Sequence, residues 1–160
     1  MQRPKYSRNP EQRTGALTVE VALVISIFMM LLAAIVEFGH VYLVINTLNA
    51  ASKQATRIGS AEQATTQDAL DRIDQIIAAG FRCEPSEVTV WVKDASIFDQ
   101  PGGPPASIDY ESLPDIELAN AETNHLFLIR IQVNYSDVAL MPPFWNDNLV
   151  LIGQSAARHE

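Results

Sequence analysis

The side chain with the clearest chemical signal in this sequence is a carboxylate inside an apolar run. Glu20 lies in the stretch from Ala16 to Val36, where the only other polar residues are Thr18 and Ser26. A charged group in hydrocarbon is costly, so it is rare in membrane segments and usually functional there. Taken alone, the residue leaves two readings open: a side chain that reaches the interface near a helix end, or one that has a specific partner.

The other residues that could do chemistry do not form a recognisable site. His40, His125 and His159 are far apart in the sequence, and the single cysteine, Cys83, cannot form an internal disulfide. No Cys/His cluster has metal-ligand spacing. No Gly-rich phosphate loop and no nucleophile-elbow pattern is present. We therefore expect no enzyme activity, no metal and no cofactor.

Charge is distributed unevenly along the chain. Residues 1–14 carry four basic side chains against Glu11, a local charge of +3, and residues 15–160 carry 7 basic and 18 acidic side chains, a local charge of −11. Because an acidic body repels phosphates, we expect no nucleic acid partner.

The apolar run is long enough to cross a membrane. The 21 residues from Ala16 to Val36 would rise roughly 31 Å as a helix, and the hydrocarbon core of a bilayer is ~30 Å thick. The basic start and acidic body predict a cytoplasmic N-terminus and an extracytoplasmic body, with the apolar run in contact with membrane lipid. Glu37 then lies at the outer interface, where we expect it to be solvated. A secretory signal peptide is disfavoured by the length of the run and by the lack of a nearby A-x-A site, whereas an uncleaved signal anchor stays open.

Two short stretches resemble a known family. Gly15-Ala16-Leu17-Thr18-Val19-Glu20 resembles the type IV prepilin processing site, in which a glycine precedes the cut and a glutamate is fifth in the mature chain. Ile35-Val36-Glu37-Phe38-Gly39 is similar to a stretch of TadE-like pseudopilins, and the alanine-rich residues 49–57 continue the similarity. The resemblance covers roughly residues 13–59.

The resemblance implies a role for each of these residues. A prepilin peptidase would cut between Gly15 and Ala16, and Glu20 would pair with the N-terminal amine of a neighbouring pilin or pseudopilin subunit. Glycine at the cut lets a protease approach the backbone closely. Tad-type patterns usually have Tyr or Phe after the glutamate, where this chain has Val21. That difference, together with the chain length, favours a TadE-like minor pseudopilin over a major Flp pilin. The implied location is the bacterial inner membrane, with single-pass topology and possible pilus association after processing.

Helical patterns continue beyond the apolar run. Leu48, Ala51, Ala55 and Ile58 recur at spacings of three and four, so the helix is predicted to continue to Ile58 and to end at Gly59-Ser60. Thr65 and Asp68 form a capping-box pattern for a second helix to about Ala79, with Gly80 as its stop. Its predicted buried stripe is Ala69, Leu70, Ile73, Ile76 and Ile77.

Beyond Pro85 the apolar period changes to two. Strands are predicted at Val88–Lys93, at Leu126–Tyr135, and from Leu149 to Gly153 with a possible extension to Ala157. The expected fold is α+β and pilin-like: a long N-terminal transmembrane helix that extends out of the membrane, a short helix, and a small antiparallel sheet of about three to four strands.

Two segments show no regular period. We expect a long surface loop at 94–122, either mobile or a binding site. The segment Met141-Pro142-Pro143-Phe144-Trp145 either caps the core or contacts a partner or the membrane surface.

The predicted organisation has three parts: a basic cytoplasmic leader at 1–15, a transmembrane and stalk helix at 16–58, and an extracytoplasmic α+β domain at 59–160. The resemblance implies a structural component of a Tad-type pilus or secretion apparatus that works in surface adhesion. The alternative is a membrane-tethered binding module whose span is only an anchor.

Overall fold

The computed structural model describes residues 10–83, 87–99, 108–140 and 148–160. It divides the chain into two compact units, Met1–Phe38 and Gly39–Glu160. Helix α1 runs from Pro10 to Gly59 and contributes residues to both units. The second unit, called the domain below, contains all the other helices and strands.

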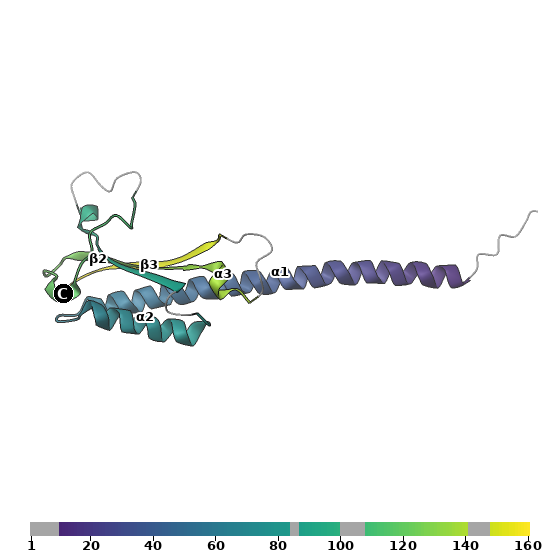
Figure 1. The fold of residues 1–160 in the computed structure, drawn as a ribbon, viewed down its shortest axis with the longest axis horizontal. Helices are drawn as coiled ribbons and strands as arrows, with labels where there is room; N and C mark the ends of the chain where they lie inside the picture. Colours follow the sequence, from purple (N-terminus) through teal and green to yellow (C-terminus); the bar gives the residue numbers. More distant parts are fainter. Residues whose placement is uncertain (1–9, 84–86, 100–107, 141–147) are drawn as a thin grey trace, which may run out of the picture. The chain divides into compact units, whose positions relative to one another are not determined.

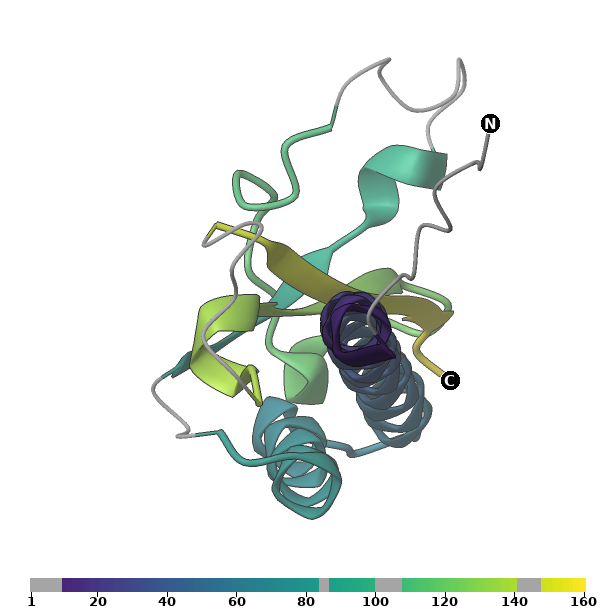
Figure 2. The ribbon, with the colours of Figure 1, turned by 90° about the vertical axis from the view of Figure 1, so that its right-hand side faces the viewer.

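The domain is a three-stranded antiparallel sheet with helices on one face (Figures 1 and 2). Helix α2 spans Thr66–Gly80. The strands are β1 (Val88–Asp94), β2 (Leu126–Asn134) and β3 (Val150–Arg158), in the order β1-β2-β3. Short helical turns are η2 (Ser96–Asp99), η3 (Leu118–Asn120) and α3 (Tyr135–Val138). The α+β prediction is confirmed.

Helix α2 begins at the capping box that the sequence predicts. Thr65 Oγ1 accepts a hydrogen bond from the backbone N–H of Asp68 at 3.2 Å, and Asp68 Oδ2 accepts one from the backbone N–H of Thr65 at 2.9 Å. Each side chain thus satisfies a backbone donor that has no partner within the helix. The hydrogen bonds from Thr65 hold the pKa of Asp68 below its ordinary value, because they favour the charged carboxylate.

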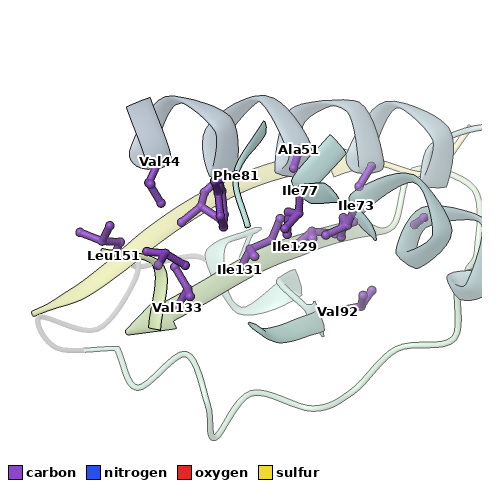
Figure 3. Packing of buried hydrophobic residues seen from close by; sticks show 14 of the residues in the cluster. Val44, Ala51, Ile73, Ile77, Phe81, Val92, Ile129, Ile131, Val133 and Leu151 are labelled. Carbon is purple, nitrogen blue, oxygen red and sulfur yellow. The ribbon is translucent and has the colours of Figure 1, made fainter. Parts of the chain in front are cut away.

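The hydrophobic core lies between the helices and the inner face of the sheet (Figure 3). From α1 it contains Val44, Leu48, Ala51 and Ala55, all fully buried, so this part of α1 is a structural element of the domain. The remaining buried members are Ala69, Ile73, Ile77, Phe81, Val92, Leu118, Phe127, Ile129, Ile131, Val133, Tyr135, Val138 and Leu151.

Strand β3 approaches α1 very closely. A Cβ atom added at Gly153 would lie 2.6 Å from Leu48 Cβ and 2.6 Å from the Leu48 carbonyl oxygen. Thr56 Oγ1, two turns further along α1, lies 3.1 Å from Ser155 Oγ. Glycine at position 153 is therefore required by the short distance between the strand and the helix backbone.

The strand boundaries differ from the prediction by a few residues: β1 ends at Asp94 rather than Lys93, and β3 starts at Val150 rather than Leu149. Strand β2 ends at Asn134, and Tyr135 starts the short helix α3 with its side chain fully buried in the core. Strand β3 continues to Arg158, because it pairs with β2 over its whole length, from Val150 opposite Asn134 to Arg158 opposite Leu126.

The outer face of the sheet is partly covered, which the sequence did not predict. Lys93 points away from the helices, yet its side chain is buried and pairs with Asp115 at 2.8 Å. Residues 110–115 form this cover. Asp94 N–H donates to the Pro114 carbonyl at 2.8 Å, and Arg130 lies 4.7 Å from the centre of the Tyr110 ring. Within the predicted 94–122 loop, the described residues thus pack on the sheet and include η2 and η3. The segment 141–145 lies outside the described residues.

Candidate functional site

The predicted cleavage site lies in the second turn of α1. The helix begins at Pro10, a residue type favoured at the first helical position. Gly15 and Ala16 are exposed, and a Cβ atom added at Gly15 would meet no heavy atom within 4 Å. Glycine in a helix interior is less favourable than alanine by about 1 kcal/mol. No described residue therefore covers the peptide bond between Gly15 and Ala16. The glycine also lowers the stability of the helix at this point.

Glu20 lies one helical turn beyond Ala16. Residues four apart in a helix share a face, so Ala16 and the carboxylate of Glu20 lie on the same side of α1. The Glu20 side chain is exposed. None of the described residues of the chain covers it.

The apolar segment after the predicted cleavage site is an exposed helix. Every residue from Gly15 to Leu32 is exposed, including the large apolar side chains from Leu17 to Leu32. Ser26 Oγ donates a hydrogen bond to the Ala22 carbonyl at 2.9 Å, which satisfies the hydroxyl within the helix. Within the described chain, one helix is long and apolar enough to cross a membrane, the segment Gly15–Gly59 of α1. This helix fits a single-pass membrane anchor.

The expectation of a solvated Glu37 is wrong. Its side chain is only 1% exposed. The reason is its place on the helix: Glu37 precedes Val44 by seven residues, or two turns, so it lies on the face of α1 that continues as Val44, Leu48 and Ala51. The helical spacing between Glu37 and the buried residues of α1 would have predicted this burial. The prediction of a solvated side chain used only the position of Glu37 just past the apolar run.

The three histidines of the domain do not share a site. His40 Nε2 lies 2.8 Å from the Val138 carbonyl oxygen, and His125 Nε2 lies 3.0 Å from Asp94 Oδ1. The His159 side chain is buried. Among the described residues, no group of three or more His, Cys, Asp or Glu side chains could hold a metal ion.

Asp94 is the carboxylate that pairs with His125. Burial alone would raise its pKa, but hydrogen bonds from Ser96 and the neighbouring His125 outweigh burial and lower the pKa. Its interactions tie the end of β1 to the turn at Ser96 and to the start of β2. These interactions give the Asp94 carboxylate a structural role.

One set of exposed apolar residues was not singled out from the sequence. Tyr42 is 69% exposed and Leu43 is 47% exposed, both shortly after the apolar run. The signal was present in the apolar residues 41–45. Val41, Val44 and Ile45 pack on the core, whereas Tyr42 and Leu43 are exposed. Only the packing of α1 in the domain distinguishes the two sets.

A family model matches the N-terminal part of the chain. The family model described as TadE-like protein matches residues 15–57. No curated protein and no solved structure matches the chain. The matched segment begins at Gly15 and includes Glu20 and the whole apolar run, and it suggests a structural component associated with a Tad pilus. Residues 15–57 of this chain are thus TadE-like, which confirms the resemblance predicted from the sequence.

Proposed function

We propose that this protein is a TadE-like minor pseudopilin, a structural component of a Tad-type pilus or secretion apparatus that contributes to surface adhesion. The observation that carries the proposal is the family match over residues 15–57, which includes Gly15, Ala16 and Glu20 at the start of one bare apolar helix. A prepilin peptidase cuts between Gly15 and Ala16 on the cytoplasmic side of the inner membrane. The domain then lies outside that membrane.

In this proposal, Glu20 sets the register between neighbouring subunits. Cleavage leaves a positive amine on Ala16, one turn from Glu20 of the same chain. A buried carboxylate without a partner costs several kcal/mol, whereas one paired with a cation costs far less. The exposed position of Glu20 on α1 supports a partner from a neighbouring helix. The amine of the next subunit supplies the required charge.

Bare helical surface around Glu20 supports packing against other subunits. Because residues 15–32 are exposed on all sides of α1, lipid or neighbouring transmembrane helices can cover them. Van der Waals packing and polar contacts drive helix association in membranes. Pilin or pseudopilin subunits and membrane lipid are thus the proposed partners.

The test compares a variant that lacks the carboxylate with one that keeps it at a different place on the helix. Glu20→Ala removes it, and the double change Glu20→Val with Val21→Glu moves it by about 100° around the helix. Both variants are expected to accumulate in the membrane, to be processed, and to lose crosslinks to pilus components. Glu62→Ala, at an exposed glutamate of the domain, is the matched control and keeps those crosslinks.

The alternative, a tethered binding module, gives a different result. In that case Gly15 and Glu20 have no role beyond the anchor. Glu20→Ala and the shifted variant would then both retain full adhesion and normal crosslinks, which would refute the register role.

A further inference from the structure

Exposed apolar side chains gather at one end of the domain. Leu140 is 62% exposed and lines a concave surface together with Leu43 and Arg82. An adjoining groove is lined by Tyr42, Leu43 and Gly80, among others. Figure 1 shows α3 and the last turn of α2 at this same end of the domain. We call the surface formed by Tyr42, Leu43, Ala79, Gly80 and Leu140 the apolar end.

The apolar end begins within a short distance of the proposed membrane span. Tyr42 follows Val36 by six residues, and six residues of helix rise about 9 Å. The headgroup layer on each side of a bilayer is roughly 5–8 Å thick. Side chains of a helix tilt toward its N-terminus, so Tyr42 and Leu43 tilt toward Gly39, where the domain begins. Tyrosine is a residue type enriched at membrane–water interfaces.

The charges of the domain also favour this end as the one that faces lipid. The described parts of the 94–122 segment lie toward the opposite end of the domain (Figure 1). The exposed acidic residues of this segment include Asp99, Glu111 and Glu117. Anionic headgroups repel such a surface. At the apolar end Arg82 is exposed beside Asp137 in the same concave surface. A guanidinium there can contact lipid phosphates while its stem lies along apolar atoms.

We propose that the apolar end docks on the headgroup layer of the bilayer that holds residues 16–36. Tyr42, Leu43 and Leu140 insert their side chains into this layer, and Arg82 contacts headgroup phosphates. The inference rests on the proposed function, because it requires that α1 span a membrane. It assigns a lipid-binding surface to the domain in addition to the span.

The experiment measures the depth of single spin labels in the full chain reconstituted in phospholipid bilayers. Cys83→Ser removes the native thiol, and labels are attached after Leu140→Cys or Tyr42→Cys; both native side chains are exposed, so the fold tolerates the change. Label accessibility to oxygen, which partitions into lipid, is compared with accessibility to a water-soluble nickel chelate. Glu62→Cys, in the exposed turn after α1, is the water control, and Ile27→Cys, in the middle of the span, is the hydrocarbon control.

The proposal predicts that labels at positions 140 and 42 are several-fold less accessible to the nickel chelate than the label at position 62. If the label at 27 is in hydrocarbon while those at 140 and 42 are as accessible as the one at 62, the docking inference is refuted and the span stands. If the label at 27 is itself accessible to the chelate, the span is absent and both proposals fail. Shielding that disappears when the protein is diluted in lipid assigns the surface to a second copy and also refutes lipid docking.

Discussion

Replacing Gly153 with alanine tests whether the second half of α1 is an integral part of the domain core. The added Cβ would lie 2.6 Å from both Leu48 Cβ and the Leu48 carbonyl oxygen. Favourable contacts between heavy atoms occur at about 3.5–4.0 Å. Strand β3 and α1 would therefore have to separate by about 1 Å, and the obstacle is helix backbone, which cannot rotate away.

The expected magnitude follows from two opposing terms. Overpacking of a core costs about 1–3 kcal/mol, and a contact with backbone places this site at the upper end of that range. Alanine recovers about 0.5–1 kcal/mol, because glycine in a strand interior is entropically unfavourable. The net loss in free energy of unfolding is about 2 kcal/mol. For a domain of the size of Gly39–Glu160, this lowers the melting temperature by roughly 8 °C.

The assay is thermal unfolding of the full chain in detergent micelles, followed by near-ultraviolet circular dichroism. This signal reports aromatic packing, including the fully buried Tyr135, and is insensitive to helix that the micelle retains. Gly39→Ala is the control, since a Cβ there meets nothing within 4 Å and alanine favours a helix by up to about 1 kcal/mol. The reasoning would be refuted if Gly153→Ala melted within about 2 °C of the unmodified protein.

Three further predictions concern the helix cap, acid stability and processing. Thr65→Ala should lower the free energy of unfolding by about 1 kcal/mol in a denaturant titration, because the capping box is lost; the exposed control Thr123→Ala should change it less, and equal effects would contradict the role of the cap. The pKa values of Asp68 and Asp94 are lowered in the folded domain, so their contribution to stability is complete above their ordinary pKa of 3.8 and is lost as the pH falls below it. The melting temperature should therefore fall steeply below about pH 4, with a shallower fall in Asp94→Asn, and an identical pH profile in that variant would count against this explanation. Gly15→Val should leave the full-length chain unprocessed in membranes, as read by immunoblot, because a side chain blocks close approach to the peptide bond; normal processing would show that the cut is elsewhere.

Most of the fold was predictable because its signals are local. The cap at Thr65, the breaks at Gly59 and Gly80, and the alternation from Phe127 to Val133 each depend on residues close in sequence. Those signals predicted helices α1 and α2 and the strands β1, β2 and β3. The apolar run and the cleavage pattern around Gly15 are also contiguous in sequence, and the family match includes them.

The features that sequence reasoning missed depend on contacts between distant segments. Lys93 follows the strand alternation and lies on the opposite face of the sheet from Val92. It is nevertheless buried, because Asp115 and the backbone of Glu111 cover it. Tyr135 continues the apolar alternation of β2, yet the chain turns into α3 there and its ring packs in the core. The period of a strand does not show which surface segment folds back over it.

The apolar end was missed for the same reason. Tyr42 and Leu43 belong to a helical stretch that is apolar on nearly every side, and only packing shows that Val44 is buried while these two are exposed. Leu140 joins them from a segment about 100 residues away in the chain. No local pattern connects them.

The central claim is that this chain is processed as a pseudopilin, and the intact mass and N-terminal sequence of the protein recovered from native membranes test it most directly. Our account predicts a mature chain that begins at Ala16, with Glu20 fifth in the mature sequence. A protein that begins at Met1 would contradict processing and favour the tethered module. A protein that begins beyond residue 36 would contradict the membrane anchor itself.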